Sequence, residues 1–141
     1  MNNLILYHKP NKSYISSLKD VYGALTILTD KEGGSLVAST FRYYGIINWQ
    51  HKYTIKHHEE VSLCTWEQYK KELDDIAELL REEKRILVHC SAGIHRTGTN
   101  GYALLRRLGY SRKDSYEIVC SIRPESSDCI RFLDWAEEYI I

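Results

Sequence analysis

The sequence has no excess of charge of either sign, because 19 Lys and Arg residues balance 19 Asp and Glu residues. A neutral chain creates no global positive field that would collect nucleic acid or an acidic membrane surface. We therefore expect neither nucleic acid nor a membrane as a partner. Any anion that the protein binds must be held by a local group of residues.

Long apolar runs are also absent, since no stretch approaches the roughly 18 residues of a membrane span. Residues 4–6 are apolar but too short for the core of a signal peptide. The four cysteines lack a Cys-x-x-Cys spacing and are too few for a disulfide scaffold. We expect a cytoplasmic protein with reduced thiols, in which Cys64, Cys120 and Cys129 are small buried hydrophobic residues.

What the sequence does contain is an ordinary globular composition, with 43% hydrophobic and 27% charged residues. Its 141 residues fit one domain with a sizeable core. Neither an internal repeat nor a linker divides the chain. We therefore interpret residues 1–141 as a single domain and expect a monomer.

Extended and helical segments alternate along the chain. A β-branched apolar run at 24–29 ends in a turn signal, and residues 35–44 can form a helix that Gly45 closes. A second extended segment begins at residue 46 and could continue to residue 55. A capping box of Thr65 and Gln68 begins the clearest helix, which is expected to reach about residue 83. Its apolar face comprises Trp66, Tyr69, Leu73, Ile76, Ala77 and Leu80.

The second half of the chain continues this alternation. Residues 86–88 are apolar without polar alternation, which is typical of a strand buried on both faces of a parallel sheet. Helices are expected at 97–108, at 111–122 and, after the break at Arg123-Pro124, at 127–139. The last helix would contribute Ile130, Leu133, Trp135 and Ala136 to the core. The pattern predicts an α/β fold, a single domain with a mostly parallel central sheet flanked by helices.

The segment between the strand at 86–88 and the next helix is where we expect the chemistry. It reads His89-Cys90-Ser91-Ala92-Gly93-Ile94-His95-Arg96-Thr97, and its successive backbone N–H groups can converge on an anion. It lacks the Gly-Lys-Ser/Thr ending of a nucleotide-binding loop, which argues against Mg-dependent nucleotide hydrolysis. Instead it carries a thiol at its start and a guanidinium at its end.

Five residues separate Cys90 from Arg96, enough for the chain to wrap around a phosphate and return the guanidinium over it in a bidentate fork. The N–H groups and the helix N-terminus favour the thiolate form of Cys90, which is the nucleophile. Thr97 can donate its hydroxyl to the sulfur when the sulfur becomes a leaving group. The predicted phosphate-binding residues are Ser91, Ala92, Gly93, Ile94, His95 and Arg96. The alternative is a Cys and an Arg that only cap a strand-to-helix turn.

These residues give the chain a resemblance to the protein tyrosine phosphatase superfamily. Its signature, His-Cys-x-x-Gly-x-x-Arg-Ser/Thr, is matched by His89, Cys90, Gly93, Arg96 and Thr97. The loop is close to the tyrosine-specific form, whereas the short chain is closer to the dual-specificity members. The resemblance implies the tyrosine-phosphatase-like fold and hydrolysis through a thiophosphoryl enzyme, without a metal or another cofactor. It also implies that His89 orients the cysteine loop through hydrogen bonds.

Relatives use an Asp on a mobile loop upstream of the cysteine as the general acid, but residues 57–64 contain no Asp. Placing the family's helix start at Thr65 puts Glu60 at the acid position, 30 residues before Cys90, with Glu59 as second choice. A Glu can act as a general acid, although its extra methylene changes its reach. A solvated pair of loop charges is the alternative. Asp74 and Asp75 lie on the helix side that is expected to face solvent.

Two further features of the sequence bear on the site. His51, His57 and His58 with the neighbouring glutamates could suggest a metal site, but they lack a helical i, i+4 pair, and no metal is expected. The family's second-step glutamine is not recognisable after Arg123-Pro124, which favours the water positioning of the dual-specificity members. Asp128 lies in that region and is assigned no role.

The sequence therefore favours a phosphatase whose partners are phosphorylated proteins or peptides, with phosphotyrosine as best substrate and phosphoserine and phosphothreonine as further substrates. A His-Arg pair at this point of the loop also occurs in relatives that cleave inositol pyrophosphates, although Ile94 does not supply their usual lysine. Hydrolysis of RNA 5'-triphosphates is disfavoured by the neutral charge. A poorly active phosphopeptide-binding module is the alternative from another class, against which the intact Cys90, Arg96 and Thr97 argue.

Overall fold

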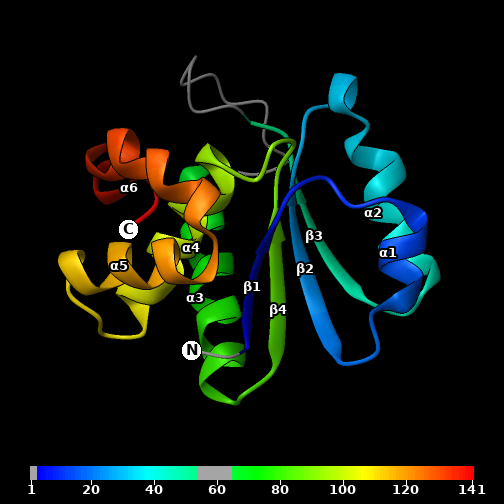
Figure 1. Ribbon diagram of the computed structural model, residues 1–141, viewed down its shortest axis with the longest axis horizontal. Helices are drawn as coiled ribbons and strands as arrows, with labels where there is room; N and C mark the ends of the chain where they lie inside the picture. The colour runs from blue at the N-terminus through cyan, green and yellow to red at the C-terminus, as the bar shows by residue number, and fades with distance from the viewer. Residues whose placement is uncertain (1–2, 54–64) are drawn as a thin grey trace.

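The computed structural model describes residues 3–53 and 65–141. Its central sheet has four parallel strands in the order β1-β4-β2-β3, namely β1 (Leu4–Tyr7), β2 (Val21–Ile27), β3 (Ile47–His51) and β4 (Arg85–His89). One face is covered by α1 (Lys12–Ser17) and α2 (Gly34–Tyr43). The other is covered by α3 (Trp66–Arg81), α4 (His95–Arg107), α5 (Arg112–Ile122) and α6 (Leu133–Tyr139) (Figure 1). The predicted α/β fold with a parallel sheet flanked by helices is confirmed.

Each face of the sheet has its own hydrophobic core, because successive strand side chains point to opposite faces. Leu25 pairs with Val88 across β2 and β4, and both belong to the larger core under α3 to α6. The next pair, Ala24 and Leu87, belongs to the smaller core under α1 and α2. The four residues of β4 that follow Arg85 are all buried, as the apolar run at 86–88 predicts.

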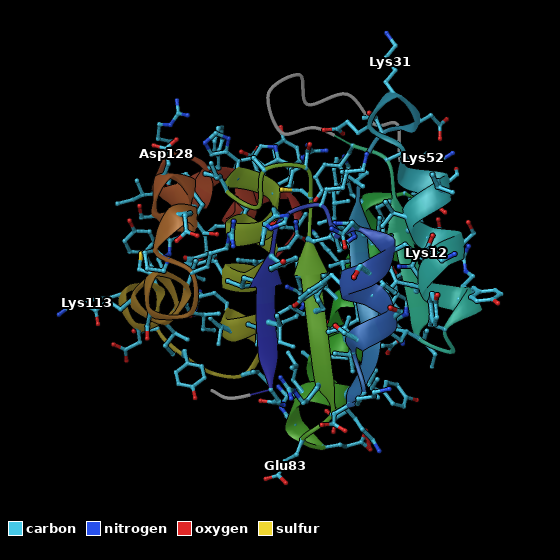
Figure 2. All side chains as sticks on the ribbon, turned by 45° about the vertical axis from the view of Figure 1, so that its right-hand side comes forward. Lys12, Lys31, Lys52, Glu83, Lys113 and Asp128 are labelled. Carbon is cyan, nitrogen blue, oxygen red and sulfur yellow. The ribbon has the colours of Figure 1, made fainter. Side chains whose placement is uncertain are left out.

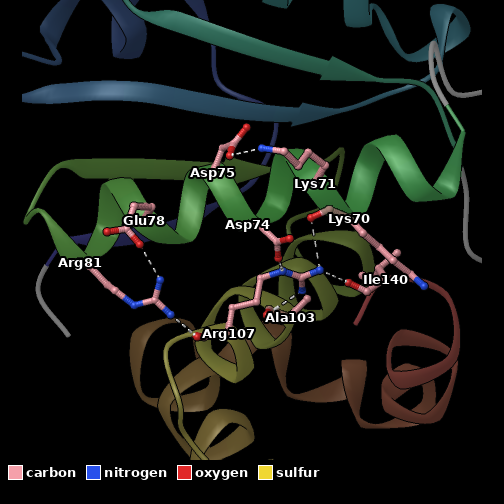
Figure 3. Close-up of polar contacts among 9 residues, drawn as sticks. All are labelled: Lys70, Lys71, Asp74, Asp75, Glu78, Arg81, Ala103, Arg107 and Ile140. Atoms are coloured by element: carbon pink, nitrogen blue, oxygen red, sulfur yellow. Dashed lines mark hydrogen bonds and ion pairs between the residues drawn. The ribbon is translucent and has the colours of Figure 1, made fainter.

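Helix α3 begins and faces the core as predicted. Thr65 Oγ1 accepts from the Gln68 backbone N–H at 3.2 Å, and Gln68 Oε1 accepts from the Thr65 N–H at 2.8 Å. The buried side chains of the helix are Tyr69, Leu73, Ile76, Ala77 and Leu80. Asp74 and Asp75 are both exposed; Asp75 pairs with Lys71 at 2.9 Å, whereas Asp74 points toward α4 (Figure 3). Within the described ranges, no helix has both the length and the apolar character needed to cross a bilayer.

Arg107, near the end of α4, connects three parts of the larger layer (Figure 3). Its Nε donates to Asp74 Oδ1 of α3 at 2.8 Å, and its Nη2 donates to the Ile140 carbonyl at 2.7 Å. Its Nη1 donates to the Ala103 carbonyl at 3.2 Å. These bonds hold α4, which begins within the predicted phosphate loop, against α3 and the end of the chain.

The first two elements were not predicted. Strand β1 pairs with β4 in the register Leu4 to Ile86, and α1 has only six residues, capped by Asn11, whose side chain accepts from the Tyr14 N–H at 2.7 Å. Both elements are too short to show a periodicity of their own. The proposed extension of β3 to residue 55 lies outside the described residues.

The helix expected at 127–139 is wrong in its first half. Residues Pro124–Phe132 form a 3-10 helix, η2, and α6 begins only at Leu133. Ile130 is 56% exposed instead of buried, whereas Trp135 and Ala136 are buried as expected. The reason is tertiary: Cys129 packs so closely on α4 that a Cβ added at Gly98 would lie 2.9 Å from its sulfur.

The cysteines outside the phosphate loop were expected to be small buried hydrophobic residues, and the described ones fit this expectation in part. Cys129 is buried, and burial raises the pKa of its thiol to about 12. Cys120 is half-buried, so it fits the prediction less well. Both are free thiols. Cys64 lies outside the described residues.

Candidate active site

The predicted phosphate loop joins β4 to α4 at the carboxyl end of the parallel strands, at the top of Figure 1. Ligands of open α/β sheets bind at this end of the strands. Gly93 adopts a φ of 72°, and a Cβ added to it would lie 2.6 Å from the Tyr7 carbonyl oxygen. Both the backbone conformation and the contact with the end of β1 therefore require glycine at this position.

Cys90 directly follows β4 and is only 3% exposed. Thr97 donates from Oγ1 to the Cys90 sulfur at 3.0 Å, which is the contact predicted from the sequence. The same hydroxyl lies 3.3 Å from the Tyr7 carbonyl, but it has a single proton to donate. A hydroxyl aimed at the sulfur stabilises negative charge on it.

Arg96 is held by a bidentate ion pair with Glu32. Its Nη1 donates to Glu32 Oε1 at 2.8 Å and its Nη2 donates to Glu32 Oε2 at 2.7 Å. The carbonyl oxygens of Ile27 and Tyr53 also accept from Nη1, at 3.1 and 3.2 Å. The hydrogen bond from Arg96 is the main reason that the pKa of Glu32 is lowered to about 2, so the carboxylate is charged at neutral pH.

This pairing leaves one edge of the Arg96 guanidinium available. Glu32 occupies the end formed by Nη1 and Nη2, and no described residue accepts a hydrogen bond from Nε. The Nε–H and the second N–H of Nη2 lie side by side on the adjacent edge. Such a pair of parallel donors matches two oxygens of a phosphate. Glu32 therefore orients the guanidinium without blocking its phosphate-binding edge.

Glu32 itself was missed by the sequence analysis. It closes the 3-10 helix η1 (Asp30–Glu32), where its Oε1 accepts from the Thr29 backbone N–H at 2.9 Å. The Thr29 to Glu32 spacing is that of a capping box, and this was the signal present in the sequence. That signal gives no reason to pair Glu32 with Arg96, 64 positions later.

His89 supports the loop through a chain of hydrogen bonds. Burial lowers its pKa to about 4, so the ring is neutral at physiological pH. Its Nδ1 lies 3.1 Å from the Cys90 carbonyl, which only accepts, and Nδ1 therefore carries the proton. Its Nε2 then accepts from Thr26 Oγ1 at 2.8 Å, and Thr26 Oγ1 accepts from Asn48 Nδ2 at 2.8 Å. The chain of bonds connects β3, β2 and the candidate nucleophile, as the orienting role expected of His89 requires.

Donors outside the loop bind its carbonyl groups. The backbone N–H of Lys9 donates to the Ser91 carbonyl at 2.9 Å. Arg123 donates to the Ala92 and Gly93 carbonyls at 3.4 and 2.8 Å, and Ser126 Oγ donates to the Gly93 carbonyl at 2.7 Å.

These bonds fix the direction of the loop's N–H groups as well. In a trans peptide the C=O of one residue and the N–H of the next point in opposite directions. With three successive carbonyls bound on the outside, the N–H groups of Ala92, Gly93 and Ile94 point toward the inside of the loop. Lys9, Arg123 and Ser126 were not predicted to support the site, because their partners are backbone atoms that the sequence does not mark.

The side chain of His95 contacts η2. Its Nε2 lies 2.6 Å from Asp128 Oδ2, Arg131 donates to the same oxygen at 2.8 Å, and the Phe132 ring is 5.0 Å from the imidazole. The ring is thus anchored beside the loop, and the backbone of His95 begins α4. Asp128, which had no role in the sequence analysis, holds this side chain.

The predicted acid, Glu60, and the second choice, Glu59, lie outside the described residues, as do His57 and His58. The last described residue before them, Tyr53, is buried and its carbonyl accepts from Arg96. His51 bonds to Glu72 and packs edge-on against Tyr69. Among the residues described, no group of three His, Cys, Asp or Glu side chains is placed to hold a metal ion.

The chain resembles known proteins in part of its sequence and in its fold. The model of the tyrosine phosphatase family matches residues 48–117, a range that contains the whole phosphate loop. No curated protein matches the sequence significantly.

Solved structures share the fold over nearly the whole chain. The active form of Tk-PTP has a TM-score of 0.67 and 20% identity, covering 96% of this chain and 93% of that chain. Human DUSP28 has a TM-score of 0.72 and 17% identity, covering 98% and 93%. PTPMT1 in complex with PI(5)P has a TM-score of 0.70 and 17% identity, covering 97% and 92%. At these identities the likeness shows the fold alone.

Proposed function

The chain belongs to the protein tyrosine phosphatase superfamily, and we propose that it hydrolyses phosphotyrosine in proteins through a phosphocysteine intermediate, with phosphoserine and phosphothreonine as further substrates. One observation carries the proposal. The sulfur of Cys90, with the Thr97 hydroxyl aimed at it, and the free edge of the Arg96 guanidinium belong to a single short loop whose N–H groups point inward.

In the first step, the thiolate of Cys90 attacks the phosphorus of the ester. An S–P bond forms while the bond from phosphorus to the tyrosine oxygen breaks. The free edge of Arg96 and the N–H groups of Ala92, Gly93 and Ile94 bind the phosphoryl oxygens. Positioned donors of this kind supply most of the stabilisation in phosphoryl transfer. The leaving oxygen takes a proton from a general acid, the role proposed for Glu60.

In the second step, water attacks the phosphorus and the S–P bond breaks. The electron pair returns to the sulfur, which the Thr97 hydroxyl stabilises at 3.0 Å. The proton released by the water goes to the carboxylate that acted as the acid. The products are inorganic phosphate and the thiolate, so neither a metal nor another cofactor is needed for the balance.

A singly phosphorylated ester suits the surroundings of the loop better than a polyphosphate. The two nearby arginines are occupied, because Arg123 binds loop carbonyls and Arg131 binds Asp128. Ile94 places no charge in the loop itself. Beyond the side chain of Lys9, a substrate with several phosphates would need further cations there. The PI(5)P bound in the PTPMT1 structure makes a phosphoinositide the second substrate to test.

The first test compares wild type with Cys90→Ser, without added metal, on a phosphotyrosine peptide, an aryl phosphate, a phosphoinositide, an inositol polyphosphate and an RNA 5'-triphosphate. We expect wild type to release phosphate from the first two and Cys90→Ser to release none. Binding of the peptide without turnover would replace the enzyme by a binding module. Activity confined to any of the other three substrates would replace the protein phosphatase by that activity.

The general acid is tested with Glu60→Gln and, as matched control, Glu59→Gln. A general acid contributes about 10²- to 10⁴-fold, and most when the leaving group is a poor one. We expect Glu60→Gln to slow an unactivated phenyl ester by about 100-fold or more, and an ester of a strongly acidic phenol much less. Equal effects of the two variants would remove Glu60 from this role.

A further inference from the structure

A groove runs along α1 and α2, beginning beside the phosphate loop. It consists of two cavities of about 440 and 380 Å³ that share Lys12, Leu36 and Thr40. Lys9 and Pro10 line one end, and Tyr43 and Tyr44 line the other. We call this surface the α1–α2 groove. None of its residues takes part in the site described above except Lys9, whose backbone binds the loop.

Large apolar side chains stand exposed in the α1–α2 groove. Leu36 is 73% exposed and Tyr43 is 79% exposed. They are seven residues apart on α2, and that spacing places both on one face of the helix. Exposed apolar side chains that gather on one surface mark a place where another molecule binds.

The groove carries positive charge without a counterion. No Asp or Glu of the described residues lines either cavity, and neither Lys9 nor Lys12 forms an ion pair with a described carboxylate. Figure 2 shows Lys12 on the side of the molecule that α1 and α2 cover. A basic and apolar groove is complementary to a segment that has acidic and apolar side chains.

Lys9 joins the groove to the phosphate loop. Its backbone N–H donates to the Ser91 carbonyl at 2.9 Å, while its ammonium reaches Gly33, where an added Cβ would lie 2.9 Å from Nζ. Gly33 follows directly on Glu32, the partner of Arg96. An extended peptide advances about 3.3 Å per residue, so a few residues beside a phosphotyrosine suffice to reach the groove.

We infer that the α1–α2 groove binds the segment of a phosphorylated protein that flanks its phosphotyrosine, and that it selects a segment with acidic and large apolar residues. The inference rests on the proposed function. It names the sequence preference of that activity, which the phosphate loop alone does not provide, since the loop contacts only the phosphate group.

The test measures kcat/KM on two phosphotyrosine peptides of equal length, one flanked by Glu and Leu, the other by Lys and Ser, with a small aryl phosphate as reference. Wild type is expected to prefer the Glu and Leu peptide. Leu36→Asp is expected to lower kcat/KM for that peptide roughly tenfold, through KM. Lys12→Glu is expected to abolish the preference for the Glu and Leu peptide, because Lys9 and the new carboxylate then leave the groove without net charge. The aryl phosphate, which is too small to reach the groove, reports on the loop alone.

Lys19→Glu and Ile47→Asp are matched controls, since both side chains are exposed and lie outside the groove. If the groove variants change the peptide preference no more than these controls, the inference is wrong while the phosphatase activity stands. A dimer that dissociates in Leu36→Asp, measured by sedimentation, would assign the groove to a second copy of the chain and overturn the inference. If wild type hydrolyses neither the peptides nor the aryl phosphate, the proposed function itself fails. The aryl phosphate thus distinguishes failure of the proposed function from failure of the inference about the groove.

Discussion

At the scale of single residues, Glu32 sets the direction of the Arg96 guanidinium, and its replacement tests that role. Glu32→Gln keeps the shape of the side chain but provides one acceptor in place of two charged oxygens. We expect kcat/KM for an aryl phosphate to fall about 10- to 100-fold, because a misplaced guanidinium binds the phosphoryl group poorly. The inhibition constant of inorganic phosphate should rise in parallel.

Glu125→Gln is the matched control for this prediction. Glu125 also faces an arginine, Arg123, but at 3.5 Å and with 60% of its side chain exposed. Exposed ion pairs of this kind contribute little, about 0 to 1 kcal/mol. Wild-type kinetics in Glu32→Gln, or an equal loss in both variants, would show that the Glu32 carboxylate does not orient Arg96.

The same ion pair makes stability depend on pH in a defined direction. The pKa of Glu32 is lowered from 4.5 to about 2, mainly by its hydrogen bond with Arg96. Its contribution is therefore fully present above about pH 4.5 and is lost as pH falls through about 2. We expect the difference in free energy of unfolding between wild type and Glu32→Gln to be constant at pH 6 to 8 and to shrink toward pH 2. Urea titrations at pH 7 and pH 3 measure it, and a difference that grows on acidification would contradict the assignment.

At the scale of elements, three strands cooperate to hold the nucleophile. Asn48 on β3 donates to Thr26 on β2, which donates to His89 at the end of β4. Thr26→Val keeps the side-chain volume but leaves His89 Nε2 buried without a partner, at a cost of about 1–3 kcal/mol. Asn48 Nδ2 loses one of its two acceptors and keeps the Ala24 carbonyl. We expect a lower kcat with little change in KM, because the phosphate contacts are untouched.

A positioning role for Thr26 is separated from a purely structural one by chemistry at Cys90. The rate of alkylation of Cys90 by iodoacetamide as a function of pH reports on the sulfur directly. We expect Thr26→Val to alter this profile and Thr26→Ser, which retains the hydroxyl, to restore it. A variant that loses stability while its alkylation profile stays that of wild type would limit Thr26 to a structural role.

Elements with strong local signals could be predicted, and those fixed by distant contacts could not. The capping box at Thr65 and the apolar period of α3 depend on neighbours within two turns, so sequence alone located them. The 3-10 helix η2 depends on the packing of Cys129 against Gly98 and on the bond from Ser126 to the loop. No local pattern contains those contacts, and the segment was therefore predicted as an ordinary helix.

In the candidate site, too, contacts within the motif could be predicted, and contacts from distant segments could not. Cys90 and Thr97 are seven positions apart in one loop, and their hydrogen bond could be expected from the motif. Glu32 reaches the loop from the turn after β2, 64 positions before its partner Arg96. Thr26 reaches it from β2 itself, 63 positions before its partner His89. Such pairs arise from the order of strands in the sheet, in which β4 lies between β1 and β2. The motif thus predicts the reacting groups, and the topology supplies the groups that orient them.

At the scale of the whole molecule, the phosphate loop is held from both layers that flank the sheet. Glu32 and Lys9 reach it from the side of α1 and α2, and Arg123 and Ser126 reach it from the side of α5 and η2. Because α4 begins within the loop, at His95, the position of the loop also depends on how α4 is packed in the larger layer. Arg107 is the side chain that ties this helix to its neighbours.

Replacement of Arg107 tests how the larger layer is held together. Arg107→Ala removes donors from the carbonyls of Ala103 and Ile140 as well as the ion pair with Asp74. The Arg107 side chain is only 9% exposed, whereas that of Asp74 is 62% exposed. We expect Arg107→Ala to lower the free energy of unfolding by about 2–4 kcal/mol and Asp74→Ala by about 1 kcal/mol or less. Chemical denaturation measures both, and an equal loss would mean that the ion pair, rather than the buried carbonyls, holds α4 in place.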